Sequence, residues 1–574
     1  MDEVKHIYKF VAADYYVIAG YLLMLVSVGF IVKKLCGNVK DYFIGGNRIP
    51  WWLAGGSCFM MSFSAWTFTG AAGFAFKHGI LICLLFYFNV FSYLFAGKFI
   101  AAKCRQSRRI TFAQIIYDRF GRIGEQFFLW IQVPNMLFCG AIWMVGLGTF
   151  ISASFGVPMP ITIIVCGVVI LIYSTISGSW AVMTTDFLQS IILMVLTTVI
   201  FFLTLGKIGG VSGVVENVEP AKLQLFSGEH TWVWALAYLG QTFFAFNTVM
   251  SAPRYLAVTE GKDAKKVAYL VAALFIVGPP IWFLPPIAAS HFFPNIAEIL
   301  PQLKNPQDAA YVLIGLSVLP KGLAGLLVMV VFAATLSIMD SSVNQNAALI
   351  SLNLYKPFFR PNASEREMFI VSRLFNVICG AAVTSGGLLL AMQGEMALFD
   401  LMLFLSGSLI LPIAVPCVLI YWVKKTPHWS AVVSVLLSMT YSIITFKMDV
   451  SFPTRVWGTV AIGVASFFLS GLFWKSVREE TKQNIFKFYK TINTPIDAAK
   501  EIDGSENVAH LYVVGVLTII VSVGLSIVAF FPNDTKGRII ILVTSVLIFI
   551  IGMAMYVIGK RSIGEIEERE IVEE

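Results

Sequence analysis

Long apolar segments recur along the whole chain, and short polar stretches separate them. Each segment has at least about 18 residues, which is enough to cross the hydrocarbon core of a bilayer as a helix. We count about fifteen such segments. They begin near Tyr15, Pro50, Gly79, Ile123, Pro158, Met183, Thr231, Lys266, Lys321, Met368, Met396, Trp429, Pro453, Leu511 and Ile539. The pattern therefore predicts an all-α polytopic membrane protein with about fifteen transmembrane helices.

Composition supports the same class of protein. Of the 574 residues, 58% are hydrophobic and only 13% are charged, and the mean hydropathy is +0.80. Soluble domains of this length are less apolar, so we expect membrane lipid around the protein. The net charge of +8 does not indicate a nucleic-acid partner, because the basic residues gather at the ends of alternate segments.

The distribution of basic residues also predicts the orientation. Arg105, Arg108 and Arg109 follow the third segment, and Lys262 and Lys265 follow the seventh, whereas the loops between are poor in lysine and arginine. Basic loops face the cytoplasm. We therefore expect a multi-pass protein of the plasma or inner membrane, with its N-terminus outside and its C-terminus in the cytoplasm.

The scattered cysteines and histidines predict neither disulfides nor a transition-metal site. Most of the eight cysteines lie inside apolar segments, and the six histidines show no helical pairing. A membrane-embedded enzyme, such as a lipid-linked transferase, would need a charged catalytic cluster or a metal-binding acid pair. Neither is apparent, so an enzyme is disfavoured.

Residues 334–342 are the most informative polar stretch, because they lie inside a long apolar run. An acid and several hydroxyls at bilayer depth are costly and usually mark an ion or substrate path. On a helix, the following residues share one face: Ser337, Asp340, Ser341 and Asn344. Their oxygen atoms suit a small hard cation such as Na⁺. The alternative is a polar seam that packs neighbouring helices together.

Two apolar segments carry unusual interruptions. Residues 53–76 and residues 232–256 are rich in glycine, serine and threonine, and they stand five crossings apart. Broken helices at matched positions of two inverted repeats are typical of a transporter's midplane site. Close packing of small residues is the alternative. A second intramembrane acid, Asp186, lies near the end of its segment, where acids often reach only the headgroups.

Several motifs together resemble the sodium/solute symporter family. They are Asp-Tyr-Phe-Ile-Gly-Gly-Asn-Arg at 41–48, Tyr-Ser-Thr-Ile-Ser-Gly-Ser-Trp-Ala-Val at 173–182 with Thr-Asp-Phe-Leu-Gln at 185–189, and Phe-Ala-Ala at 332–334 through Asp-Ser at 340–341 to Asn-Leu-Tyr-Lys at 353–356. The resemblance runs in order from about residue 41 to residue 425. One departure is Ser179, which stands where the family has the second glycine of a turn.

The resemblance implies a leucine-transporter-type fold, as in sodium/glucose cotransporters. Residues 50–425 would form a ten-helix core of two inverted five-helix repeats, with broken first and sixth core helices. Residues 1–49 would hold the outer N-terminus, an extra helix and a cytoplasmic loop. Residues 426–560 would add peripheral helices with a cytoplasmic linker near 475–510, and residues 561–574 an acidic cytoplasmic tail. The acidic composition of residues 565–574 itself predicts that they are solvated and disordered.

The resemblance also implies sodium ligands. One Na⁺ would bind the carbonyls of Met60, Phe63 and Ala334 and the hydroxyl of Ser337. A second set would combine Ser337 with Asp186, Asp340 and Ser341. Ile338 stands where the family supplies another hydroxyl. A proton in place of Na⁺ therefore stays open as the coupling ion.

By the same resemblance, six residues would surround the solute: Ser62, Trp66, Thr67, Asn89, Gln241 and Phe244. Aromatic side chains replace most polar sugar-binding groups of the relatives, so a galactose-type substrate is not carried over, and these rings can equally serve packing. The expected function is a sodium-coupled secondary active symporter that imports a sugar, amino acid, carboxylate or vitamin by alternating access. A proton-coupled or uncoupled carrier on the same fold is the alternative.

Overall fold

A computed structural model of the protein describes residues 9–32, 44–176, 179–301, 303–393, 396–501, 509–531 and 533–573. This part of the chain is helical throughout and contains only isolated β-bridges outside the helices. Eleven of the described helices are long and apolar enough to cross a membrane, and two shorter apolar helices cover Ala12–Leu25 and Met159–Ser174. The prediction of an all-helical protein with many membrane-spanning segments is confirmed.

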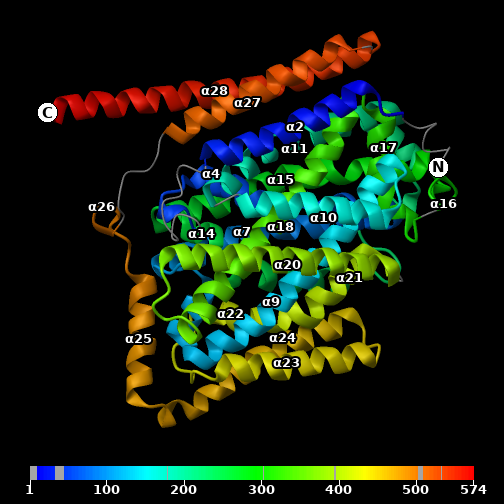
Figure 1. Ribbon diagram of the computed structural model, residues 1–574. Coiled ribbons are helices and arrows are strands. Elements are labelled where there is room, and N and C mark those ends of the chain that lie inside the picture. The colour runs from blue at the N-terminus through cyan, green and yellow to red at the C-terminus, as the bar shows by residue number, and fades with distance from the viewer. Residues whose placement is uncertain are drawn as a thin grey trace.

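Most helices lie roughly side by side in one bundle (Figure 1). At one edge α27 (Ala509–Ile527) packs along α28 (Thr535–Glu573), and at the opposite edge α23 (Ser430–Lys447) packs along α24 (Phe452–Leu469). The shorter helix α25 (Glu479–Asn493) runs across the general helix direction near one end of the bundle. The peripheral pairs thus flank a central group of helices.

Helix α18 (Leu323–Ile350) lies at the centre of this group, and its spanning window is buried over its whole length. It contacts α9 (Phe112–Phe155), α11 (Ser179–Ile208), α20 (Glu365–Gln393) and α2 (Ala12–Val32). Polar side chains at bilayer depth are costly where they face lipid, and the buried window of α18 keeps them away from it. The polar residues of α18 therefore face protein rather than lipid.

Both interrupted segments are broken helices. The first forms α4 (Trp51–Met60), α5 (Ala65–Phe68) and α6 (Gly70–His78), and the Ser64 hydroxyl caps α5 by accepting a hydrogen bond from the Trp66 N–H at 3.2 Å. The second forms α13 (Trp232–Phe246) and α14 (Pro253–Ala257). Serine caps and proline at a helix start are the local chemistry that stops and restarts a helix.

The central helices are completed by α7 (Leu81–Phe99), α10 (Met159–Ile176), α15 (Gly261–Phe292), α21 (Leu398–Leu405) and α22 (Leu411–Leu419). α7 and α15 pack along each other, and α15 also packs on α4. At the C-terminus, α28 continues to Glu573. The prediction that the acidic tail is disordered is wrong here, because its glutamates favour continuation of the preceding helix.

Candidate functional site

Four helices bring polar side chains together in the interior. α18 supplies Ser337 and Ser341, α11 supplies Asp186, α4 supplies Ser57 and α14 supplies Arg254, and all five side chains are buried. We call this set the polar cluster. Ser57 and Arg254 alone are 197 residues apart in the sequence, so only the tertiary fold assembles the cluster.

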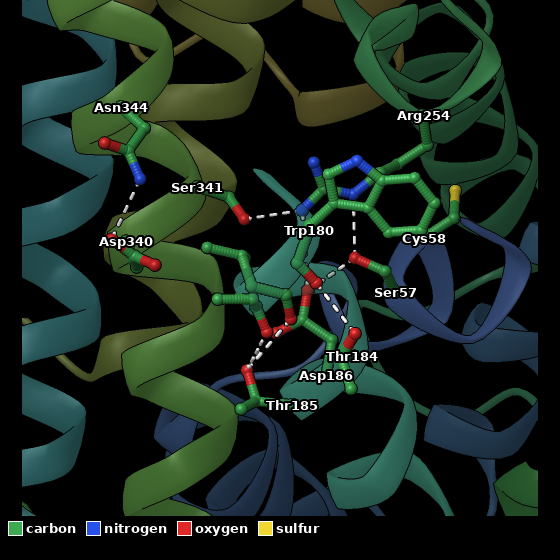
Figure 2. Close-up of polar contacts among 12 residues, drawn as sticks. Ser57, Cys58, Trp180, Thr184, Thr185, Asp186, Arg254, Asp340, Ser341 and Asn344 are labelled. Atoms are coloured by element: carbon green, nitrogen blue, oxygen red, sulfur yellow. Dashed lines mark hydrogen bonds and ion pairs between the residues drawn. The ribbon is translucent and has the colours of Figure 1, made fainter. Parts of the chain in front are cut away.

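The guanidinium group of Arg254 holds the polar cluster together (Figure 2). Its Nε donates to Ser57 Oγ at 2.8 Å, and its Nη2 donates to Ser341 Oγ at 2.7 Å and lies 3.4 Å from Asp186 Oδ2. The Ser57 hydroxyl donates to the same carboxylate oxygen. A buried charge is stable only when it is paired and hydrogen-bonded, and the Asp186–Arg254 pair meets this requirement on one side of the carboxylate.

Two oxygen atoms of the polar cluster remain available. Asp186 Oδ1 and Ser337 Oγ are buried and have no hydrogen-bond partner among the described residues. The Ser337 hydroxyl lies close enough to the Asp186 carboxyl group to interact with it, although the two groups do not form a well-aligned hydrogen bond. A buried polar atom without a partner costs about 1–3 kcal/mol. A small cation that is coordinated by oxygen atoms would satisfy both atoms at once.

Asp340 takes a different direction from Ser341. Its Oδ1 accepts a hydrogen bond from Asn344 Nδ2 at 2.9 Å, and Asn344 Oδ1 accepts one from Asn376 Nδ2 of α20 at 2.7 Å. Figure 2 draws Asp340 and Asn344 on the side of α18 away from Arg254. The polar face of α18 therefore has two neighbours. Ser341 contacts Arg254 of α14, whereas Asn344, which bonds Asp340, contacts Asn376 of α20.

The break in the first interrupted segment contacts α18 directly. The Ala65 N–H donates to Thr335 Oγ1 at 2.8 Å, which ties the start of α5 to α18. The Met60 carbonyl accepts a hydrogen bond from the Phe63 N–H at 2.9 Å across the break. Met60, Phe63 and Ala334 are all fully buried. The predicted carbonyl ligands thus lie on two elements, the break and α18, that are in contact.

Sequence reasoning missed three members of this region: Ser57, Thr335 and Arg254. Arg254 follows Pro253 at the end of an interrupted segment, just before the basic residues Lys262 and Lys265, so the sequence does not separate it from a basic loop. In the structure it begins the short helix α14 and is only 7% exposed. Arg254 lies at the end of an interrupted apolar segment that contains no acidic residue. A charged residue in that position is the sequence signal that points to a buried partner on another helix.

A cavity of about 370 Å³ lies next to the polar cluster. Of the predicted solute-binding residues, four line it: Ser62, Trp66, Asn89 and Gln241. Thr67 is buried outside the cavity wall, and Phe244 packs with the α22 and α24 residues Leu411 and Val460. Ile338 and Arg254 line the same cavity, so it reaches the polar cluster.

Further polar groups of the cavity wall come from residues that the sequence did not indicate. Gln132 and Asn135 of α9 line it, and Tyr93 OH lies 3.0 Å from Ser62 Oγ. Asn135 Oδ1 and Gln241 Oε1 are buried without a hydrogen-bond partner among the described residues. These two amide oxygens can accept hydrogen bonds from O–H or N–H groups of a bound molecule.

Trp66 forms part of the wall toward α21. Its Nε1 donates to the Leu398 carbonyl at 3.0 Å, and its ring stacks on Phe399 with 5.9 Å between the centroids. The indole therefore joins α5 to the start of α21. Movement of either element would change the cavity on this side.

Comparison with known proteins finds several that are similar to this chain. The model of the family described as "Sodium:solute symporter family" matches residues 42–438. A sodium/glucose cotransporter of Vibrio parahaemolyticus is 24% identical over 79% of this chain and 88% of its own length. The sodium/sialic acid symporter SiaT of Proteus mirabilis (strain HI4320) is 22% identical over 80% of this chain and 95% of its own length.

Solved structures show the same fold. The substrate-bound outward-open state of a Na⁺-coupled sialic acid symporter has a TM-score of 0.69 at 20% identity, and the match covers 82% of this chain and 99% of that one. A closed nucleobase-cation-symport-1 family transporter has a TM-score of 0.50 at 14% identity, over 78% of this chain and 98% of that one. At these identities the likeness concerns the arrangement of the helices.

Proposed function

The chain belongs to the sodium:solute symporter family, whose model matches most of its length, and we propose that it imports a small organic solute together with Na⁺ by alternating access. Members of this family are transporters, not enzymes. The single observation that supports the sodium site is the pair of unpartnered oxygens, Asp186 Oδ1 and Ser337 Oγ, buried where the broken α4–α5 segment contacts α18.

The proposed transport core covers residues 50–425 as two inverted five-helix repeats. In this assignment α4–α6 form the broken first core helix, α13–α14 the broken sixth and α18 the eighth. The two broken helices and the two shorter apolar helices join the eleven long spans to give the proposed fifteen crossings. The basic loops then lie in the cytoplasm and the N-terminus outside.

The first proposed Na⁺ position uses the carbonyls of Met60, Phe63 and Ala334 with the Ser337 hydroxyl. Carbonyls of unwound backbone and a serine hydroxyl are the oxygen ligands that transporters of this architecture offer to Na⁺. Ile338 contributes no oxygen to the set. We propose that Asp186 Oδ1, which is unpartnered and lies beside Ser337, supplies the missing oxygen ligand and adds a negative charge.

A second proposed position, at Asp186, Ser337, Asp340 and Ser341, is in competition with Arg254. The guanidinium group already bonds Ser341 and lies against the Asp186 carboxylate. A second cation could gain these ligands only after Arg254 moves away, since two positive charges at one carboxylate repel each other. Arg254 and a second Na⁺ would thus occupy this position in turn. Binding of the second Na⁺ would therefore favour a conformation in which Arg254 has moved away from Asp186.

The proposed solute binds in the cavity beside the polar cluster. Gln241 Oε1 and Asn135 Oδ1 would accept hydrogen bonds from its hydroxyl or N–H groups, and Trp66, Tyr93 and Phe275 would cover an apolar face. Relatives are named for glucose, sialic acid and myo-inositol, all of which carry several hydroxyl groups. A hydroxyl-rich small solute is the class that this wall supports best.

Transport of Na⁺ and of the solute is coupled because both ligands favour the same conformation of the protein. Na⁺ at the break braces α4–α5 against α18 and thereby stabilises the state in which the cavity can accept the solute. A ligand shifts a conformational equilibrium only by its differential affinity for the two states. Each Na⁺ that enters down a potential of 100 mV contributes about 2.3 kcal/mol of driving force.

Uptake into proteoliposomes tests this function. A thermal-shift screen of sugars, sialic acid, myo-inositol, amino acids, carboxylates and vitamins identifies the solute, because a ligand of the folded state raises the melting temperature. Uptake of that solute should then fall to background when choline replaces Na⁺. Undiminished uptake in choline would reject sodium coupling in favour of a proton-coupled or uncoupled carrier, and a proton gradient would separate those two.

A further inference from the structure

A second large cavity lies against α25. It measures about 820 Å³ and is enclosed by the first residues of α9, the 428–429 connection and α25. Five basic side chains line it: Arg109, Arg119, His428, Arg478 and Lys487. We call it the basic cavity. None of its lining residues belongs to the proposed ion or solute sites.

Arg119 is the most unusual residue of the basic cavity, because it is a buried cation without a buried anion. It is 1% exposed, and no carboxylate among the described residues pairs with it. Its Nη2 donates to Thr426 Oγ1 at 2.7 Å and to the Val423 carbonyl at 3.1 Å, and its Nε lies 3.4 Å from Tyr489 OH. Its Nη1 is buried and has no hydrogen-bond partner in the described part of the chain.

A second nitrogen in the same cavity is also unpartnered. His428 Nδ1 is buried and makes no hydrogen bond to the described residues. The cavity has one carboxylate in its wall, Asp118, and both of its oxygens accept hydrogen bonds from Arg109 at 2.7 Å. Arg478 and Lys487 are exposed and have no carboxylate partner among the residues described. Positive charge therefore exceeds negative charge in the cavity wall.

From these contacts we propose that the basic cavity binds the phosphate group of an anionic ligand. A buried charge with an open donor is costly unless a counter-ion reaches it, and the planar guanidinium fork matches phosphate oxygens. Arg478 and Lys487 add charge at the rim, where they attract anions. The same chemistry serves an anionic phospholipid headgroup or a free phosphate ion.

Exposed apolar side chains lie next to the basic cavity, so a phospholipid is tested separately from a free phosphate ion. Trp429 of the cavity wall packs against Phe473 with 5.7 Å between the ring centroids, and Phe473 is 57% exposed. Leu472 beside it is 78% exposed. Exposed apolar side chains next to a basic pocket suit a molecule with both an acyl chain and an anionic headgroup.

A bound phosphate would fasten α25 to the transport core. Tyr489 of α25 donates to the carbonyls of Ile420 and Val423 at 2.8 and 2.6 Å and lies against Arg119. An anion between Arg119, Lys487 of α25 and Arg478 at the N-terminal cap of α25 would add charge-assisted bonds across the same junction. Binding should therefore raise the thermal stability of the whole protein.

Thermal unfolding of the purified full-length protein in a neutral detergent tests the proposal. One arm adds phosphatidylglycerol and compares it with phosphatidylcholine, and the other adds inorganic phosphate and compares it with chloride at the same ionic strength. A rise in melting temperature with phosphatidylglycerol alone supports a lipid headgroup site. A rise with inorganic phosphate as well supports a site for the phosphate ion itself.

Two double variants on the same segment make the test specific. Arg478→Gln with Lys487→Gln removes charges that line the cavity, whereas Lys475→Gln with Lys490→Gln removes two exposed charges that do not. The first pair should weaken the apparent affinity for the active probe by about tenfold or more, and the control pair should leave it unchanged. Arg119→Gln should also abolish the response, but its bonds to the 423–426 segment make the rim pair the safer variant.

The proposal is overturned if neither probe raises the melting temperature of the wild-type protein. It is also overturned if the lining pair and the control pair respond alike, because the effect would then be a general attraction of anions to a basic surface.

Discussion

Two of the buried arginines, Arg254 and Arg119, differ in where their counter-charge comes from. Arg254 is 7% exposed and lies against Asp186, which the fold itself supplies. Arg119 is 1% exposed and bonds only carbonyl and hydroxyl oxygens of the described residues. The difference separates a charge neutralised within the transport core from a charge at the periphery that remains available to an outside anion.

The largest effect is expected for Asp186→Asn, which gives Arg254 the unpaired state that Arg119 has. Removal of one partner of a buried ion pair leaves the other charge uncompensated, so we expect a loss of about 3 kcal/mol in stability. The variant should also lose its response to Na⁺, because the open Asp186 Oδ1 loses its negative charge. Thermal unfolding in NaCl and in choline chloride measures both effects, and wild-type stability would show that Arg254 needs no carboxylate.

Arg119→Gln should cost less, about 1.5 kcal/mol in the absence of added anion. The substitution breaks the bond to Thr426 Oγ1, but it also removes a buried charge that has no carboxylate partner. Thermal unfolding in lipid-free detergent gives the comparison with Asp186→Asn. A loss as large as that of Asp186→Asn would contradict the distinction between the two arginines.

Thr335→Val should cost about 1 kcal/mol, since it leaves the Ala65 N–H without its acceptor in a buried position. The shape of the side chain is retained, so the loss reports the bond between the break and α18. The same variant should weaken the Na⁺ response, because the bond helps to hold the carbonyls of the break against α18. Proteolysis or unfolding assays that detect no change would mean that the break is held by packing alone.

Ser337→Ala is expected to have the smallest effect on stability, below about 0.5 kcal/mol without Na⁺, because its hydroxyl has no partner to lose. The Na⁺ concentration at half-maximal response should nevertheless rise about tenfold. Ser342→Ala is the matched control, because Ser342 is buried on the same helix and lines the cavity without belonging to the proposed ion ligands. Equal Na⁺ responses in both variants would exclude Ser337 as a ligand.

The parts of the fold and the candidate site that depend on local pattern could be predicted from the sequence. Apolar runs predicted the spanning helices, and clusters of glycine, serine and threonine marked both broken segments. Ser337 and Ser341 are four residues apart, so any helix places them on one face. Asp186 stood out because an acid inside an apolar segment is costly.

Contacts between distant segments could not be predicted in this way. Arg254 meets Asp186 across 68 residues, and Arg119 meets Tyr489 across 370 residues. No local sequence pattern distinguishes either arginine from the basic residues of a loop. The cavity wall likewise gains Gln132 and Asn135 from α9, whereas Thr67 and Phe244, predicted by likeness to relatives, lie outside it. Side-chain direction at a helix break depends on packing that a single sequence does not encode locally.

The central claim is that Na⁺ binds where the break after Met60 meets Ser337 of α18. Equilibrium binding of radioactive sodium to the purified protein in choline chloride tests it without knowledge of the solute. We expect saturable binding that unlabelled Na⁺ displaces and K⁺ does not, together with a large loss of binding in Ser337→Ala and in Asp186→Asn. Absence of saturable binding to the wild-type protein, or full binding in both variants, would contradict the claim.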